Sequence, residues 1–349
     1  MTWLTTDLQG SGGVLHADPN DFIVEEIPSY LPSGEGEHLM MRIEKIGLTT
    51  PEALRRLATA LELHPRDLGT AGMKDKNARA RQWVSAPWPV KKALPDLSRL
   101  ESPDLRVLEA DRHGNKLKRG HQRGNRFEIT VRGVAPGGLD RARAILEALR
   151  ARGVPNAFGP QRFGARGDNA DQALAILRKE ERPPRDRRIL GLLFSALQSK
   201  VFNRTLALRI ERGLFTTALA GDVMQKHDTH GLFDCVDASA DQPRVEALQI
   251  SPTGPLPGPQ MRPAHGVPHE LELAALADCR LTGDDVSRLD AGTRRVLRYP
   301  LDPEARLSPI DPDAYRLEVT LPSGAFATVL LGELIKPESG VVLREEDAA

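Results

Sequence analysis

The sequence predicts an α+β fold in which one domain is interrupted by another. Strand-like and helix-like segments interleave without the regular strand–helix alternation of a doubly wound parallel sheet. The alternating pattern near the end of the chain, at 315–321, resembles the beginning of the chain more than its helical middle. The 349 residues allow about two domains. We therefore expect a first domain at 1–155 that resumes at 303–349, with an insertion domain at 156–302.

Elements of the first domain follow from local patterns. Thr50 followed by Pro51 is a helix start, and leucines at three- and four-residue spacing continue that helix to about residue 63. A second apolar stripe predicts a helix over 139–150. Short β-favouring stretches predict strands at 21–26, 38–43, 82–85, 106–109 and 126–131.

The middle of the chain is predicted to be helical. Apolar periodicity indicates helices over the ranges 170–179, 188–212 and 269–277. Six prolines within 251–268 predict an extended or turning surface segment there, and neither a helix nor an interior strand. After the insert, we expect strands at 315–321 and 325–331.

Composition excludes several classes of protein. Lys+Arg and Asp+Glu both number 48, so the net charge is zero, and 40% of the residues are hydrophobic, which fits a globular protein of the cytoplasm. No apolar run has the ~20 residues that span a bilayer. Cys235 and Cys279 form no zinc-binding pattern, and His227 with His230 lacks a third ligand, so we expect no metal. The Walker A, dinucleotide-binding, serine-hydrolase and zincin motifs are absent from the sequence.

The most basic stretch is 112–126, which contains no acidic residue. A solvated loop is the ordinary explanation of such a run. Glycines and asparagines between the cations also let backbone N–H groups approach an anion, which favours a clamp for the phosphates of RNA or DNA. The cations that we expect to contact this backbone are Lys116, Lys118, Arg119, Arg123 and Arg126.

Asp75 is surrounded in sequence by cations, among them Lys74 and Lys76. A lone Asp beside a glycine is most often a turn cap. Nearby positive charge keeps a carboxylate ionised, however, and an ionised carboxylate can act as a nucleophile or as a base. Gln161 and Arg162, in a glycine-flanked loop, are further candidates for contact with nucleic acid.

Six blocks of this sequence, in order, resemble the TruD family of tRNA pseudouridine synthases. They are Asp21-Phe22-Ile-Val-Glu-Glu, Gly34-Glu-Gly-Glu-His38, Ala71-Gly-Met-Lys74-Asp75, Arg119-Gly-His-x-x-Gly-Asn125-Arg-Phe127, Phe158-Gly-x-Gln161-Arg162-Phe-Gly164 and Ser323-Gly-Ala-Phe326-Ala-Thr. The resemblance implies a pseudouridine synthase catalytic domain with a mixed, largely antiparallel sheet, interrupted by a family-specific insertion domain. It also implies an isomerase that converts a uridine of tRNA, typically at position 13, to pseudouridine without a cofactor or metal.

The resemblance also implies roles for single residues. Asp75 occupies the position of the family's catalytic aspartate. Phe22, Asn125 and Phe326 occupy positions that hold the target uridine. Aromatic faces suit an extruded base, and an amide suits the polar edge of uracil.

One position departs from the family. Members usually carry a lysine six residues before the phenylalanine of the first block, where it pairs with the catalytic carboxylate, and this chain has His16 there. His16, Lys74 or an arginine is therefore expected to be the partner of Asp75. We expect tRNA as the binding partner, a monomer and no membrane. The alternatives are a non-catalytic RNA-binding or RNA-chaperone protein, or a synthase that modifies another RNA.

Overall fold

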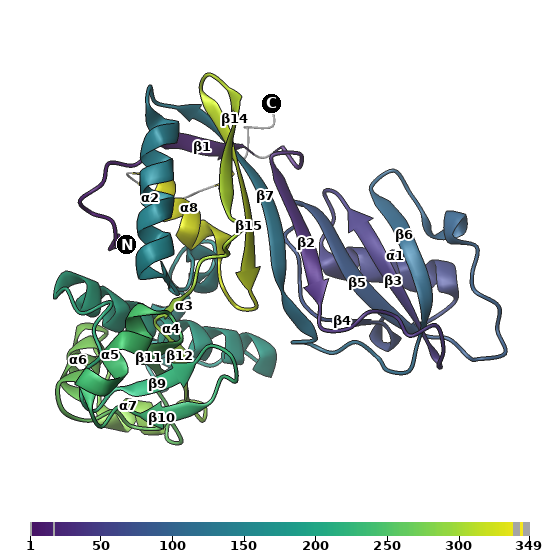
Figure 1. Cartoon of the computed structure of the whole chain (residues 1–349). Helices are drawn as coiled ribbons and strands as arrows, with labels where there is room; N and C mark the ends of the chain where they lie inside the picture. Colours follow the sequence, from purple (N-terminus) through teal and green to yellow (C-terminus); the bar gives the residue numbers. More distant parts are fainter. Residues whose placement is uncertain (1, 17, 338–342, 345–349) are drawn as a thin grey trace. The chain divides into compact units, whose positions relative to one another are not determined.

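The structure is a computed structural model that describes residues 2–16, 18–337 and 343–344 of the chain (Figure 1). These residues form two compact units. We call the first the sheet unit, which comprises 11–16, 18–142, 302–324 and 343–344. We call the second the helical unit, which comprises 2–10, 143–301 and 325–337. Both units are discontinuous in sequence. The expected domain limits at 155 and 302 stay a prediction.

A mixed sheet of ten strands, counted over the described residues, forms the sheet unit (Figure 1). Its main path runs β14-β15-β7-β2-β5-β3-β6, with β1, β4 and β16 pairing at its sides. Among these described strands only the pairs β2–β5 and β1–β16 are parallel, which confirms the predicted α+β class with a largely antiparallel sheet. The strands are β1 (Gly12–His16), β2 (Phe22–Pro28), β3 (His38–Lys45), β4 (Gly69–Thr70), β5 (Arg79–Pro87), β6 (Leu105–His113), β7 (Gln122–Val134), β14 (Arg306–Asp311), β15 (Ala314–Pro322) and β16 (Leu343–Arg344).

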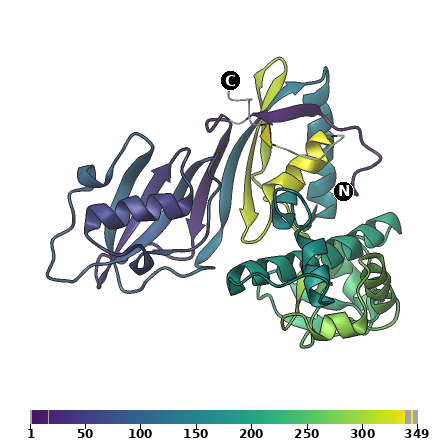
Figure 2. The same ribbon diagram turned by 180° about the vertical axis from the view of Figure 1, so that it is seen from behind.

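Helix α1 (Thr50–Leu61) lies across one face of this sheet (Figure 2). Its start is fixed by a capping box, in which Thr49 Oγ1 accepts from the N–H of Glu52 and the Glu52 carboxylate accepts from the N–H of Thr49. Leu57 and Leu61 then point inward and pack against alternate residues of β3 and β5. Fully burying one such leucine contributes about 1.5–3 kcal/mol. The predicted helix at 51–63 is confirmed.

The opposite face of the sheet carries alternating charges. Arg42 on β3 bonds Glu109 on β6 at 3.0 Å and also Glu25 on β2. Arg81 on β5 bonds Glu44 on β3 at 2.9 Å. Partly exposed pairs of this kind contribute at most about 1 kcal/mol each. The part of this face around Arg42 and Arg81 is therefore polar, and Met40, Trp83 and Leu117 form a small apolar cluster elsewhere on it. The larger apolar cluster, which includes α1, lies on the opposite face.

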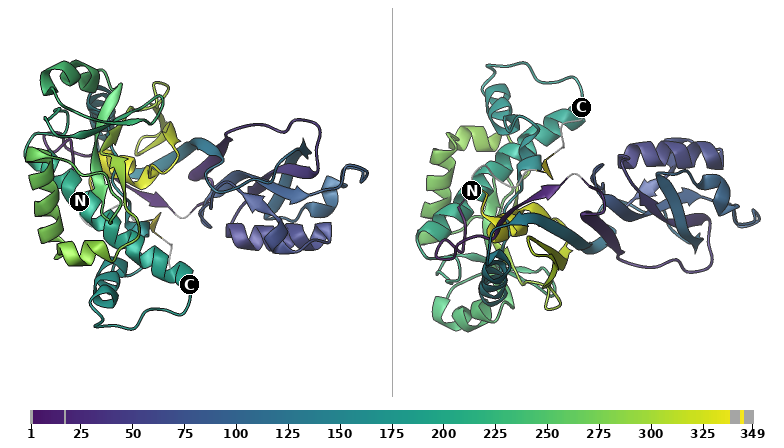
Figure 3. Two further views of the ribbon diagram at one scale, coloured as in Figure 1. Left: turned by 90° about the horizontal axis from the view of Figure 1, so that it is seen from below. Right: turned by 90° about the horizontal axis from the view of Figure 1, so that it is seen from above.

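The helical unit is built around α4, a helix of 25 residues with α3 and α6 packed against it (Figure 3). A four-stranded sheet of order β10-β9-β11-β12 lies in the same unit. No helix among the described residues is both long and apolar enough to cross a membrane. The elements are β8 (Val154–Pro155), α3 (Asn169–Leu177), α4 (Arg187–Glu211), β9 (Val223–Lys226), β10 (Leu232–Asp234), α5 (Ala238–Glu246), β11 (Ile250–Leu256), α6 (Gly266–Asp278), α7 (Gly283–Ser287), β12 (Thr293–Val296), β13 (Arg298–Tyr299) and α8 (Ala327–Ile335). Helix α2 (Gly138–Arg152) begins in the sheet unit and ends in this one.

Two sequence-based expectations are wrong. The stretch 325–331, expected to be a strand, lies largely in helix α8, which is buried nearly all round and so shows no helical periodicity in its sequence. The proline-rich stretch, expected to exclude an interior strand, begins with β11, which pairs with both β9 and β12. Proline is tolerated there because its carbonyl still accepts a hydrogen bond, as that of Pro252 does from the N–H of Leu297 at 2.9 Å.

Candidate active site

The loop between β4 and β5 carries Lys74 and Asp75 and is held at the first turn of α1. The backbone N–H of Lys74 donates to Thr50 Oγ1 at 3.0 Å, and that hydroxyl donates to Gln82 Oε1 on β5 at 3.0 Å. The Asp75 side chain is half-buried, and its Oδ1 accepts from the N–H of Asn77 at 3.3 Å, as in an Asx turn. The cap function expected of an Asp in a turn is thus present.

Lys45, at the end of β3, holds the backbone of Asp75 and was not found from the sequence. Its side chain is 0% exposed, and Nζ donates to the carbonyl oxygens of Asp75 at 2.6 Å and Leu48 at 2.7 Å. Burial lowers the pKa of Lys45 to about 8. The positive charge of Lys74 also lowers this pKa, whereas the negative charges of Asp75 and Glu52 raise it. The sequence did contain a sign of this role, because Lys45 falls on the same face of β3 as three buried apolar residues.

A buried ion pair fixes the Lys74 side chain. Its Nζ donates to Glu26 Oε2 at 2.8 Å and to Gln122 Oε1 at 3.1 Å, and the two charged side chains are 5% and 0% exposed. Glu26 Oε1 also accepts the backbone N–H of Trp83 at 3.2 Å. The Glu26 carboxylate therefore ties the loop to β2 and β5, and Gln122 ties it to β7. Whether Lys74 or His16 pairs with the Asp75 carboxylate stays a prediction, and the His16 side chain lies outside the part of the chain that the structure describes.

The register of β2 and β7 brings Phe22 and Asn125 to the same face as this loop. Phe22 is paired with Ile129 and Glu26 with Asn125. Directly paired residues and alternate residues of a strand share one face. Phe22, Asn125 and Glu26 thus lie on one face, and Glu26 binds the neighbour of Asp75 in sequence. The Asn125 Oδ1 atom is buried and has no hydrogen-bond partner among the described residues.

Phe326 belongs to the helical unit and is described within that unit. It is the residue before the first turn of α8, and its ring centroid lies 5.8 Å from that of Phe158. Gly159 permits the close approach of Thr328 on α8, because a Cβ atom at position 159 would lie only 2.6 Å from Thr328 Oγ1. Leu321 on β15 is paired with Asn125, and Phe326 comes five residues after Leu321 in the sequence.

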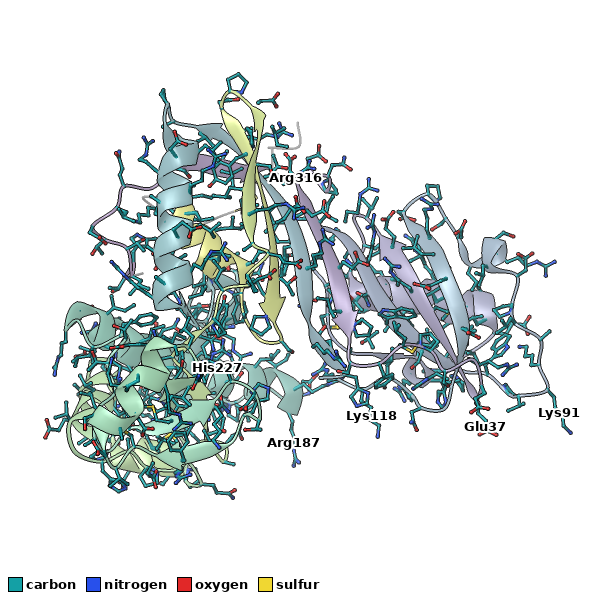
Figure 4. All side chains as sticks on the ribbon, viewed as in Figure 1. Glu37, Lys91, Lys118, Arg187, His227 and Arg316 are labelled. Atoms are coloured by element: carbon teal, nitrogen blue, oxygen red, sulfur yellow. The ribbon has the colours of Figure 1, made fainter. Side chains whose placement is uncertain are left out.

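The basic stretch 112–126 is an ordered segment that leads into β7. Tyr30 anchors it, stacking on His113 with ring centroids 4.7 Å apart and bonding His121 Nδ1 at 2.7 Å. The Lys118 and Arg119 side chains are exposed, and the side chain of Lys118 extends away from the ribbon (Figure 4).

The three other cations that we expected to contact RNA have internal partners. Lys116 Nζ donates to the carbonyl of Arg66 at 2.9 Å, and Arg123 donates to that of Ser29 at 3.3 Å. Arg126 is 3.3 Å from Glu318 on β15, which reduces the positive charge that it presents.

His227, which we expected not to bind a metal, has a structural partner. Its Nε2 atom lies 2.8 Å from Ser251 Oγ, and burial lowers the pKa of His227 to about 4. Across the described residues, no group of three or more His, Cys, Asp or Glu side chains is placed to hold a metal ion.

Comparisons with known proteins match nearly the whole chain. A family model described as tRNA pseudouridine synthase D (TruD) matches residues 1–182 and 185–334. The chain is 49% identical to the tRNA pseudouridine synthase D of Anaeromyxobacter dehalogenans strain 2CP-1, over 97% of each chain. It is 40% identical to that of Thermus thermophilus, over 99% of this chain and 95% of the relative. The crystal structure of a TruD protein from Methanosarcina mazei shares the fold, with a TM-score of 0.75, 23% identity and coverage of 97% and 96% of the two chains.

Proposed function

Because this chain belongs to the TruD family of tRNA pseudouridine synthases, we propose that it modifies the uridine at position 13 of tRNA with Asp75 as the essential carboxylate. The chain is a tRNA pseudouridine synthase, an isomerase that converts uridine in tRNA to pseudouridine. The reaction breaks the C1′–N1 bond and joins C1′ to C5. The proton at C5 is lost and N1 gains one, so atoms and electrons balance without an outside reagent.

The shared face of β2 and β7 is the observation that supports this assignment of residues. It presents Phe22 and Asn125 on the side of the sheet where Glu26 binds Lys74, next to Asp75. The buried, unpartnered Oδ1 of Asn125 can accept the N3–H group of a uracil, which satisfies an atom that is otherwise costly to bury. We assign Phe326 to the same base as a stacking partner.

Asp75 has two possible chemical roles. It can attack carbon as a nucleophile, or it can remove a sugar proton as a base. In both, the carboxylate must be ionised and fixed in direction. The anchors of the loop, namely Lys45 on the Asp75 carbonyl and Thr50 on the Lys74 N–H, provide such fixation before the substrate arrives.

An Asp75→Asn variant tests the assignment. We expect pseudouridine formation in tRNA to fall by a factor of about 10²–10⁴ or more, with the tRNA dissociation constant unchanged, because the substitution removes the reacting charge and keeps the shape. Asp67→Asn, at an exposed carboxylate in the neighbouring 3-10 helix (Pro65–Asp67), is the matched control and should be fully active. Analysis of tRNA nucleosides measures both, and turnover by Asp75→Asn would refute the role of this residue.

The basic stretch is proposed to bind the RNA backbone. Replacing Lys118, Arg119 and Arg123 with Ala should weaken tRNA binding and reduce the slope of log K against log[salt] by about one per lost phosphate contact. Lys91→Ala, at an exposed lysine of another loop, should leave the slope unchanged. An unchanged slope in the triple variant would mean that the stretch does not contact RNA.

Three further points are proposals that the sequence supports. They are the insertion domain at 156–302, a monomer and a cytoplasmic location. Pseudouridine mapping of total RNA from cells that lack the gene tests the proposed position, because loss of modification at position 13 of tRNA alone is expected.

A further inference from the structure

Two guanidinium groups lie over one phenylalanine ring in the helical unit. The Cζ atoms of Arg162 and Arg295 are 5.2 Å and 4.3 Å from the ring centroid of Phe158. Phe158 is only 6% exposed and packs edge-on against Phe202 of α4. The ring of Phe326 also contacts Phe158. The two cations therefore share a ring with the residue proposed to stack on the uridine.

Each of the two arginines donates a hydrogen bond from Nε to a neutral group. Arg162, in the 3-10 helix Pro160–Phe163, donates from Nε to Ser199 Oγ at 3.1 Å. Arg295, on β12, donates from Nε to the carbonyl of Asn156 at 3.0 Å. The contact of Arg162 with Ser199 uses Nε, so its terminal nitrogens remain for another ligand.

The charge of Arg162 is not balanced by an acid. No carboxylate among the described residues forms an ion pair with it, and burial lowers its pKa. Burial also lowers the pKa of Arg295, and the charge of Arg162 lowers it further, to about 10. A half-buried cation without an acidic partner, as at Arg162, destabilises the fold unless an anion binds there.

Simple stacking does not account for this arrangement. Arg244 also lies over a ring, with its Cζ 5.4 Å from the centroid of Phe233, and it is paired with Asp241 at 2.9 Å. Arg298, stacked on Phe215, has no acid partner either, but its terminal nitrogens donate to the carbonyls of Arg152 and Val245. Arg244 and Arg298 thus bond through their terminal nitrogens within the protein, whereas Arg162 bonds the described residues through Nε only. A neutral side chain could pack on Phe158 without the cost of a half-buried charge.

We propose that Arg162, stacked on Phe158 beside Arg295, binds a backbone phosphate of the RNA substrate next to the extruded nucleotide. The planar guanidinium of an arginine can bind two oxygens of one phosphate. Phosphate is the anion that RNA presents to an enzyme. Because Phe158 contacts Phe326, the proposed stacking partner of the uridine, we take this phosphate to be one near the target base. The inference rests on the proposed function, since it takes tRNA as the ligand.

Equilibrium binding of tRNA over a range of KCl concentrations tests the proposal. Arg162→Gln should weaken binding about tenfold at low salt and reduce the slope of log K against log[salt] by about 0.7–0.9, the loss of one phosphate contact. Arg162→Lys should keep most of the slope, because the charge remains. Arg244→Gln removes a stacked arginine that already has an acid partner, so its slope should equal that of the wild type. An unchanged slope in Arg162→Gln, or an equal loss in Arg244→Gln, overturns the proposal.

Protection of the wild-type protein provides a second test that does not depend on a folded variant. Phenylglyoxal modification of Arg162, followed by mass spectrometry, should be slowed by tRNA and far less by an equal concentration of inorganic phosphate. Equal modification with and without tRNA overturns the proposal. Failure of the proposed function is distinct, because it would appear as full turnover by Asp75→Asn, whereas these measurements report binding alone.

Discussion

The buried pair of Glu26 and Lys74 gives the sharpest prediction for stability. In Glu26→Gln, the amide oxygen can still accept the N–H of Trp83, but the ammonium of Lys74 loses the carboxylate charge that lies 2.8 Å away. The two side chains are 0% and 5% exposed, so water replaces little of the lost interaction. Leaving one charge of a buried pair typically costs about 3–5 kcal/mol. We expect the lower end, about 3 kcal/mol, because Gln122 Oε1 remains 3.1 Å from the ammonium.

Urea unfolding followed by tryptophan fluorescence measures this loss, since Trp83 is 3% exposed and adjoins the pair. The double variant Glu26→Gln with Lys74→Met removes both charges and should recover about 2 kcal/mol relative to the sum of the single variants. Asp104→Asn breaks the exposed pair with Arg56 and should cost at most about 1 kcal/mol. A loss below about 1 kcal/mol in Glu26→Gln, or strict additivity in the double variant, would refute the reasoning.

Three further predictions concern other parts of the chain. The folded chain loses the Lys45 proton near pH 8 and the unfolded chain near 10.5. Between these pH values the wild type should therefore gain about 3 kcal/mol of unfolding free energy relative to Lys45→Met. A difference between the two proteins that stays constant with pH in urea unfolding would contradict this. Burial raises the pKa of Cys235 to about 12 and that of Cys279 to about 11. At about pH 8, both thiols should therefore react with Ellman's reagent far more slowly in the native protein than in urea. Equal rates would show that the thiols are accessible. Gly124→Ala would place a Cβ atom 2.3 Å from the carbonyl oxygen of Leu321, so it should lower stability by about 1–3 kcal/mol, and an unchanged urea midpoint would mean that the sheet relaxes freely.

The sequence predicted those elements whose pattern is local. The helix at 51–63 was found because its cap, its proline and its leucine spacing agree, and the strand at 315–321 because one face is buried and the other is not. Helix α8 was missed because apolar residues surround it, and an apolar run of that length fits a strand equally well.

The candidate site was predictable as a set of residues and not as an arrangement. Motifs identified Phe22, Asp75 and Asn125, but the pairing of β2 with β7 joins residues about 100 positions apart, and register of that kind is set by tertiary packing. The roles of Lys45 and Glu26 depend on which backbone atoms approach them, which no local pattern records.

The position of β15 in the chain has a consequence for synthesis on the ribosome. This strand completes one side of β7, yet about 180 residues separate the end of β7 from the start of β15. At roughly 5–20 residues per second, the hydrogen-bonding groups on that side of β7 wait about 10–35 s for their partner. During translation this long strand is an open edge that can pair with a neighbouring nascent chain, so the lag between these two segments sets how long the growing polypeptide is exposed to misassembly.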